Sequence, residues 1–399
     1  MTDNNENKVL NVPHLRFPEF SGEWEIYPLT DFMSFKNGMN PDAKRFGRGT
    51  KFISVMDILN NQFICYDNIR ASVEVVDGDI ETYGVNYGDI LFQRSSETLE
   101  DVGQANVYLD SKPAVFGGFV IRGKSKSNYY PMFFRYLLAS PTARKKIIVK
   151  GAGAQHFNIG QDGLSKVCLN IPSIQEQEKI AKLFECIDTR IATQNKIIED
   201  LKKLKSAIIH RCYSSQTNMI PLSELLKQCS DRNRSGSDLQ VLSVSNKYGF
   251  IAQSNQFEDR EVASDDTSNY KVVKKGMFAY NPARINVGSI ALYEMDGNGI
   301  VSPMYVCFTT KSELLPSYLK YYFASQTFKH EMYKRLEGSV RLCLTFEELC
   351  NIEIHLPSIE QQKNISKYIS KIENNLSLVD SIFSKYQQQR RYLLSQMFI

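Results

Sequence analysis

Short polar segments that carry arginine, glutamine or asparagine follow apolar runs in both halves of the chain. Gln93-Arg94-Ser95-Ser96 follows one such run, and Tyr280-Asn281-Pro282-Ala283-Arg284 ends another. Arginine can donate two hydrogen bonds to guanine, and glutamine or asparagine can pair in the same way with adenine. Because the pattern occurs in both halves, these two segments are the first places where we expect contacts to DNA bases.

Further expected contacts are isolated cations and glycine-punctuated loops, in which lysine side chains and backbone amides suit phosphates. Any one such side chain, taken singly, is more often a solvated surface residue. The expected set in the first half is Lys36, Arg45, Arg48, Lys51, Gln93, Arg94, Ser95, Ser96, Gln155 and His156. The expected set in the second half is Arg232, Asn233, Arg234, Asn246, Lys247, Tyr280, Asn281, Arg284, Ser339 and Arg341.

One segment satisfies the P-loop expression G-x-x-x-x-G-K-[ST] letter for letter, from Gly118 to Ser125. A phosphate cradle needs a loop of backbone amides after a strand, whereas Phe119-Val120-Ile121 is typical of the strand itself. The corresponding segment of the second half keeps the apolar run and loses the motif. We therefore expect no nucleotide to bind there.

Other catalytic patterns are incomplete. Asn281-Pro282-Ala283-Arg284 is similar to an adenine methyltransferase motif but lacks its second proline and its aromatic residue. Pro41-Asp42 has no E-x-K partner that would make a nuclease site, and no cysteine–histidine spacing fits zinc. We expect no catalytic residue, no metal and no bound cofactor in this chain, so that any DNA chemistry belongs to another subunit.

An internal repeat dominates the sequence. Pro172-Ser-Ile-Gln-Glu-Gln returns as Pro357-Ser-Ile-Glu-Gln-Gln, 185 residues later, and the offset holds without a gap from Gly103 against Gly288 to the end. The helical ends match well, while 36–102 and 232–287 share little. One structural unit is therefore present twice with a variable part in each copy, as a reader of an asymmetric two-part target would need.

Each copy ends in a long helix that opens after a serine. Ser173 and Ser358 are candidate N-caps, with Glu176 and Gln361 three residues later as capping-box partners. No proline or glycine interrupts either run. Apolar residues recur at steps of three and four and predict a seam between the helices. Its members are Ile187, Ile191, Ile198, Leu201, Ile208, Ile372, Leu376, Phe383, Tyr386 and Leu393.

An antiparallel pairing of these helices would return the C-terminus to the first domain. Lys205 and Arg390 interrupt the seam at equivalent places. They could fix the register of the pair at some cost in stability, or extend to solvent from frayed ends. We prefer the second interpretation.

The remaining segments predict short strands and helices, so the fold class is α+β. Expected strands include 52–55, 89–92 and 119–121 with their counterparts 242–244, 277–280 and 305–308, and short helices follow each set. We expect two tandem mixed domains with twisted, antiparallel or mixed sheets, each followed by a long helix, and the two helices pairing as an antiparallel coiled coil. The boundaries are 1–171 for domain one, 172–214 for helix one, 215–356 for domain two and 357–399 for helix two.

Composition limits the class of protein. The 399 residues carry a net charge of +4, which permits nucleic-acid binding without requiring it. The eight cysteines are scattered, and no run approaches the roughly 20 apolar residues of a membrane span. The polar first residues show no signal peptide. We expect a cytoplasmic protein without membrane contact.

Taken together, the chain resembles the specificity subunits of type I restriction-modification systems. The resemblance covers nearly the whole chain and rests on the opening 12–24, on Gly88-Asp89-Ile90-Leu91-Phe92, on the two Pro-Ser-Ile-x-x-Gln helix starts and on the duplicated layout. It implies a split DNA target, with each half read by one target-recognition domain and the helices setting the gap. It also implies two modification subunits and restriction subunits as partners, with S-adenosylmethionine, ATP and Mg bound by those subunits.

Three other interpretations stay open. A stand-alone sequence-specific DNA-binding regulator would need no methyltransferase partner. An enzyme, either a P-loop ATPase or a methyltransferase, would turn over ATP or bind S-adenosylmethionine. A pure coiled-coil adaptor would leave no footprint on DNA.

Overall fold

The computed structural model describes all residues except 1–9, 154, 216, 235–238, 254–266 and 338–341. It divides into two compact units. Unit 1 is Met1–Asn195 with Ser381–Ile399, and unit 2 is Lys196–Asp380. The expected boundaries set the helices apart as segments of their own, whereas in the structure each unit holds one end of both helices.

Each unit contains a four-stranded antiparallel sheet with the same strand order. Unit 1 has β2(Met33–Asn37), β9(Val120–Ser125), β5(Ile90–Gln93) and β7(Ala105–Val107) in this spatial order. Unit 2 has β13(Leu226–Cys229), β20(Val306–Thr310), β17(Phe278–Tyr280) and β18(Ile290–Leu292). The repeat in the sequence is therefore a repeat in topology, although the strands are short and share few identities.

A second sheet in each unit mixes parallel and antiparallel pairs. In unit 1 the order is β4(Ala71–Val73), β3(Phe46–Ile53), β8(Val115–Phe116), and β3 pairs with β8 in parallel. In unit 2 the order is β15(Gly249–Ala252), β14(Gln240–Ser245), β19(Gly299–Val301), β16(Lys271–Val273), with β14 parallel to β19. The expectation of mixed, mostly antiparallel sheets is confirmed.

Two short helices follow the main sheet in each copy. They are α3(Pro131–Ala139) and α4(Pro141–Ile148) in unit 1, and α8(Pro316–Phe323) and α9(Gln326–Tyr333) in unit 2. Ser140 Oγ accepts a hydrogen bond from Ala143 N at 3.2 Å, and the equivalent Ser325 Oγ accepts from Phe328 N at 3.0 Å. These serines are N-caps. They begin the second helix at the same point in both copies.

Small elements complete the two units. In unit 1 they are β1(Glu25–Pro28), η1(Leu29–Asp31), η2(Ala43–Arg45), α1(Val55–Asn60), η3(Tyr66–Asn68), α2(Asp79–Tyr83), β6(Ser95–Ser96), β10(Phe157–Asn158), α5(Gln161–Ser165) and β11(Cys168–Ile171). In unit 2 they are β12(Met219–Pro221), α7(Leu222–Leu225), η5(Pro282–Val287), α10(Phe346–Cys350) and β21(Glu353–His355). The pairs β1–β11 and β12–β21 tie the start of each domain to the strand that leads into its long helix.

The long helices are α6(Ile174–Tyr213), 40 residues, and α11(Ile359–Gln396), 38 residues. The capping box is complete in α11, where Ser358 N donates to Gln361 Oε1 at 3.0 Å and Gln361 N donates to Ser358 Oγ at 3.4 Å. In α6 only the serine half forms, from Glu176 N to Ser173 Oγ at 3.4 Å. The prediction that the Glu176 side chain returns a hydrogen bond to the Ser173 backbone is therefore wrong.

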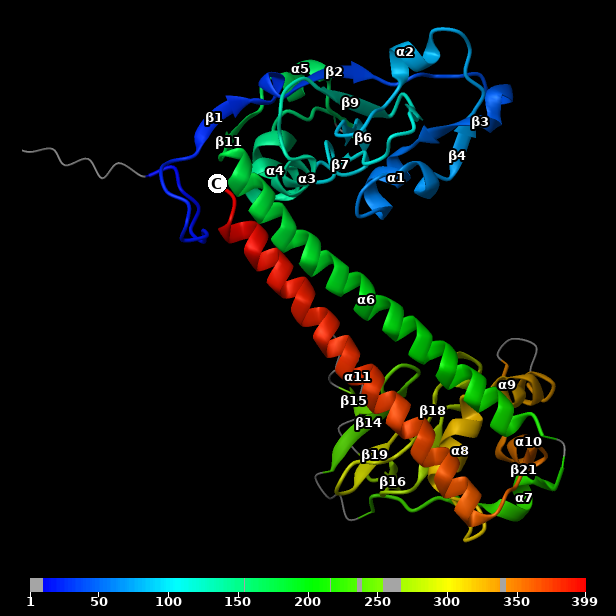
Figure 1. Cartoon of the computed structure of the whole chain (residues 1–399). Coiled ribbons are helices and arrows are strands. Elements are labelled where there is room, and N and C mark those ends of the chain that lie inside the picture. Colours follow the sequence, from blue (N-terminus) through cyan, green and yellow to red (C-terminus); the bar gives the residue numbers. More distant parts are fainter. Residues whose placement is uncertain (1–9, 154, 216, 235–238, 254–266, 338–341) are drawn as a thin grey trace, which may run out of the picture. The chain divides into compact units, whose positions relative to one another are not determined.

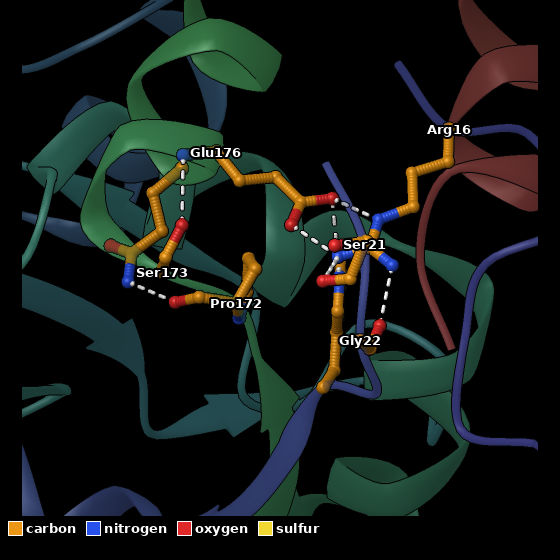
Figure 2. A network of polar contacts seen from close by, with 8 residues as sticks. Arg16, Ser21, Gly22, Pro172, Ser173 and Glu176 are labelled. Carbon is orange, nitrogen blue, oxygen red and sulfur yellow. Dashed lines mark hydrogen bonds and ion pairs between the residues drawn. The ribbon is translucent and has the colours of Figure 1, made fainter. Parts of the chain in front are cut away.

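The Glu176 carboxylate binds the N-terminal segment instead. Arg16 Nε and Nη2 donate to its two oxygens at 2.8 and 2.7 Å, and Trp24 Nε1 donates to Oε1 at 3.3 Å. Figure 2 shows this carboxylate reaching Arg16, which also bonds the backbone oxygens of Ser21 and Gly22. A bidentate guanidinium–carboxylate pair makes two charge-assisted hydrogen bonds where the capping box would make one. This outcome could not be read from spacing within the helix.

A buried glutamine joins the start of each long helix to the domain that precedes it. Gln177 Nε2 donates to Pro172 O at 3.0 Å, and its Oε1 accepts from Tyr130 N at 3.1 Å. Gln362 Nε2 donates to Pro357 O at 2.9 Å, and its Oε1 accepts from Leu315 N at 2.8 Å. The amide satisfies backbone groups that a buried helix start would otherwise leave without partners. This explains the shared glutamine of the two helix starts.

Within each unit the two helices run antiparallel. In unit 1 the Arg390 guanidinium of α11 meets Asp188 of α6, and in unit 2 Lys205 of α6 meets Glu373 of α11. All ten expected seam residues are buried or half-buried. The preference for frayed, solvent-extended Lys205 and Arg390 is wrong, because each has a carboxylate on the facing helix.

The end of α11 completes the core of unit 1, as expected for an antiparallel pair (Figure 1). Phe398 is 2% exposed and lies with its ring centroid 6.4 Å from Trp24 and 5.8 Å from Phe184. Leu15 N also donates to Gln396 O at 2.9 Å. Burying a side chain of this size stabilises the fold by about 1.5–3 kcal/mol. The C-terminus is therefore a structural part of the first domain.

Candidate nucleic-acid interface

The loop after β5 is built by three segments that the sequence separates. Arg94 N donates to Phe119 O at 2.9 Å, and Arg94 Nη1 donates to Gly118 O at 3.2 Å. On the other side, Ile159 N donates to Arg94 O at 2.9 Å. The backbone of Arg94 is thus held from both sides. Its half-exposed side chain is attached at a single guanidinium nitrogen.

The glycine-punctuated loop joins this place. Strand β10 pairs with β6, so that Asn158 faces Ser95 and Phe157 faces Ser96. The hydroxyl of Ser95 bonds the side chain of Asn158. Gln155 and His156 lie directly before this pair, and both are exposed. The structure therefore brings together the expected contacts from 94–96 and 155–156.

An apolar pocket that the sequence did not reveal lies beside this loop. It has a volume of about 410 Å³ and reaches from Phe46 and Phe52 of β3 to Ser95 and Phe119. Three large apolar side chains on its wall are unusually exposed: Phe119 at 69%, Met56 at 59% and Phe46 at 43%. Apolar side chains of this kind contact the thymine methyl group in the major groove. The sequence signal for this pocket was Phe119, which follows Gly117-Gly118 and precedes an apolar strand.

The basic residues near β3 are already engaged within the protein. Arg45 pairs with Asp79 and Arg48 Nη2 lies 2.7 Å from Glu74 Oε2. Lys51 Nζ donates to Ile69 O at 2.7 Å, while Lys36 Nζ lies 5.5 Å from the centre of the Tyr83 ring. A hydrogen bond from the Val76 backbone, and then the contact with Arg45, lower the pKa of Asp79. These four residues remain predicted DNA contacts. Because their side chains already bind groups within the protein, Arg94 is the stronger candidate for a contact to DNA.

In unit 2 the loop after β17 follows the strand equivalent to β5. Asn281 caps η5 by accepting from Ala283 N at 3.1 Å, which leaves Arg284 exposed on the first turn. The β14–β15 turn lies against this segment, because Ser289 Oγ donates to Val244 O at 2.9 Å. Asn246 and Lys247 are exposed in that turn. The structure thus places the turn of Asn246 and Lys247 against the segment that carries Arg284.

Several expected contacts are placed elsewhere. Tyr280 is fully buried and its hydroxyl donates to Leu344 O at 3.1 Å, so its expected role in DNA contact does not fit its place in the core. Gln93 and Asn233 are buried as well, at 5% and 3% exposure, and Gln93 Nε2 donates to Ser95 O at 2.9 Å. The buried Gln93 side chain therefore supports the Arg94 loop from the interior of the protein.

The other second-copy candidates are scattered. Arg232 forms a β-bridge with Lys271 at the β16 edge of its sheet, and the exposed Arg234 follows it. Ser339 and Arg341 lie outside the described residues.

In the described parts of the chain, no arrangement of residues supports the catalytic or metal-binding alternatives. The P-loop-like segment is strand β9, which pairs with β2 through Lys124 and Ser125 and with β5 through Gly123. Among the described residues, no group of three His, Cys, Asp or Glu side chains could hold a metal ion. No helix in these regions is long and apolar enough to cross a bilayer.

Comparison with known proteins shows which proteins this chain is similar to. The model of the type I restriction modification DNA specificity domain matches residues 21–203 and 236–382. A putative type I restriction enzyme MjaX specificity subunit of Methanocaldococcus jannaschii is 22% identical, with 93% of this chain and 92% of that protein covered. The MjaVIII specificity subunit of the same organism is 24% identical, with 94% and 91% covered. The crystal structure of a type I restriction-modification S subunit from M. genitalium matches with a TM-score of 0.60 at 15% identity, over 97% of this chain and 99% of that one.

Proposed function

Since this chain belongs to the type I restriction-modification DNA specificity family, we propose that it reads a split DNA target, one half with each recognition domain. The chain is the specificity subunit of this family and not its catalytic subunit. The observation that supports the two-part reading is the similar placement of a half-exposed arginine, Arg94, and an exposed one, Arg284. Arg94 follows β5 and Arg284 follows β17, which hold equivalent places in the four-stranded sheets of the two units.

Each loop combines polar and apolar recognition. In the first domain Arg94 and Ser95 would bond base edges, while Phe119 and Met56 would contact thymine methyl groups. In the second domain Arg284, Asn246 and Lys247 would supply the polar contacts. The two loops differ in sequence and in backbone form. The two half-sites would therefore differ, and the full target would not be palindromic.

The paired helices would set the distance between the half-sites. Helix α6 has 40 residues, and at 1.5 Å per residue it is about 60 Å long. Half-sites one helical turn apart lie about 34 Å from each other. A helix of this length is long enough for such a spacing.

The catalytic partners would dock on this chain. Two modification subunits would methylate adenine with S-adenosylmethionine, and restriction subunits would use ATP and Mg to translocate and cleave DNA. We place the assembly in the cytoplasm, where it would have access to DNA. No residue of this chain is assigned to catalysis or to a cofactor.

A methylation map tests the proposal. The chain is expressed with and without a type I modification subunit, and modified adenines are then located by sequencing. We expect methylation at one split motif, and only when both proteins are present. Absence of methylation together with specific DNA binding by the chain alone would favour a stand-alone regulator and overturn the proposal.

A further inference from the structure

A cleft of about 520 Å³ in unit 1 lies where α3 meets the paired ends of α6 and α11. Three arginines line it: Arg135 from α3, and Arg390 and Arg391 from α11. Asp188 of α6 is the one carboxylate among the lining residues. The described wall therefore carries three positive charges and one negative charge, a surplus of +2.

Each oxygen of the carboxylate already has a partner. Asp188 Oδ1 lies 2.5 Å from Arg390 Nε, and Asp188 Oδ2 accepts from the Tyr136 hydroxyl at 2.9 Å. Arg135 donates from Nε to Gln62 O at 3.2 Å, and among the described residues neither Arg135 nor Arg391 has an ion-pair partner. Burial, and then the neighbouring Arg390, lower the pKa of Arg135. A half-buried cation beside another cation is a costly arrangement unless an anion joins it.

The second copy shows that the scaffold does not need this surplus. Lys320 stands at the place of Arg135, and its Nζ lies 2.6 Å from Glu294 Oε2. Lys205 and Glu373 stand at the places of Arg390 and Asp188 and pair at 2.6 Å. Ser206 replaces Arg391. The same helix packing is thus built with two cations and two carboxylates, so the charge of the unit 1 cleft is a separate property.

We propose that this cleft binds a phosphoryl group. A planar guanidinium donates two parallel hydrogen bonds to phosphate oxygens, and arginines on different elements can reach different oxygens of one tetrahedral group. The surplus of +2 equals the charge of a terminal phosphate dianion, while a backbone phosphodiester, with a single negative charge, would neutralise half of it. The Gln62 and Gln387 amides on the wall add further donors.

The group could come from the DNA backbone or from a free nucleotide, and the two sources are separable. If it comes from the backbone, the inference rests on the proposed function, and the cleft would position the duplex without reading its sequence. If it comes from a nucleotide, the cleft is a ligand site that is independent of the target.

The test uses the full chain and an Arg135→Gln, Arg391→Gln double variant. Lys320→Gln is the matched control, because it alters the equivalent place where the charge is already paired. Binding of inorganic phosphate and of ATP is measured by calorimetry, and binding of target duplex is measured as a function of salt. Circular dichroism and the emission of Trp24, the one tryptophan, verify folding. The exposed Arg391→Gln single variant is used if the double variant does not fold.

For a backbone phosphate, we expect the double variant to reduce the salt dependence of DNA binding by roughly one to two released counterions, with base preference unchanged. For a nucleotide, we expect loss of phosphate and ATP binding with DNA binding intact. The control should match the wild type in every assay. A double variant that equals the wild type in DNA salt dependence and in phosphate and ATP binding overturns the inference. If the wild type fails to bind any split target, the proposed function fails, while the phosphate arm still reports on the cleft.

Discussion

Asp188 of α6 and Arg390 of α11 form an ion pair in unit 1, and the residues 185 positions away, Glu373 and Lys205, form the same pair in unit 2 with the helices exchanged. A tyrosine of the equivalent short helix completes each contact. Tyr136 donates to Asp188 at 2.9 Å and Tyr321 donates to Glu373 at 2.9 Å. The polar interruption of the seam is therefore a three-residue contact that occurs in both copies.

Breaking this contact should destabilise the chain. Asp188→Ala leaves the Arg390 guanidinium and the Tyr136 hydroxyl half-buried without their acceptor, at an expected cost of about 1–3 kcal/mol in the free energy of unfolding. Urea denaturation measures it. The exchange Asp188→Arg with Arg390→Asp should recover part of the loss. Asp162→Ala, which removes a solvent-exposed pair with Lys166, is the control and should cost about 0–1 kcal/mol.

Arg94→Ala and Arg284→Ala should each relax one half-site. Loss of a bidentate base contact costs about 1–3 kcal/mol of discrimination, confined to the half that the residue reads. Methylation maps of the two variants measure this directly. Arg211→Ala on α6 is the control, because Arg211 is an exposed arginine outside the predicted DNA contacts. If both variants keep full specificity at every position, the assignment of these loops is wrong.

Phe119→Ala should weaken recognition with little effect on folding, because the ring is 69% exposed. Wild-type protein should also prefer thymine over uracil at the contacted position, since uracil lacks the methyl group. Competition binding with uracil-substituted target duplexes measures the preference. An equal loss of affinity for all positions and for non-specific DNA would contradict a contact to thymine.

Glu176→Ala should release the N-terminal segment. It removes the bidentate partner of Arg16 and the acceptor of Trp24 Nε1, at an expected cost of about 1.5–3 kcal/mol. Because Trp24 is the one tryptophan and is 2% exposed, its emission should shift to longer wavelength. Gln361→Ala removes a cap bond in unit 2 and should leave the emission unchanged. An unshifted spectrum in Glu176→Ala would show that the segment docks without this contact.

Cys307 should resist alkylation in the folded chain. Burial raises the pKa of its thiol to about 12, so the reactive thiolate is scarce near neutral pH, while Cys168 and Cys186 are exposed and should react first. The folded state holds this proton more tightly than the unfolded state, whose thiol has a pKa of about 8.5. The contribution of Cys307 to stability should therefore fall as pH rises above about 8.5. Mass spectrometry after iodoacetamide treatment tests the first point, and unfolding of Cys307→Ala across pH tests the second.

Much of the fold followed from local signals. Ser173 and Ser358 begin the long helices, and the ten seam residues recur at helical spacing. Each of these signals acts within a few residues along the chain. The 185-residue repeat then required both copies to share one topology, because equivalent apolar patterns bury equivalent faces.

The partners of charged side chains could not be found in this way. Glu176 sits at a capping-box position but binds Arg16, 160 residues away in sequence, and Arg390 meets Asp188 across 202 residues. A charged side chain binds the strongest partner that the fold places near it. The spacing of residues along one helix does not show which side chains a distant segment places there. The same reason explains why Arg45 and Arg48, expected at DNA, are engaged by Asp79 and Glu74.

The sequence by itself determined the duplicated α+β layout, the two long helices with their seam, and the family resemblance, because periodicity, capping and repetition are local or self-referring properties. Only the tertiary structure decided which loop residues are exposed, that Tyr280 belongs to the core, that Phe119 borders an apolar pocket, and that three arginines of unit 1 share a cleft. Exposure and net charge at a place are sums over segments far apart in the chain, and only folding brings those segments together.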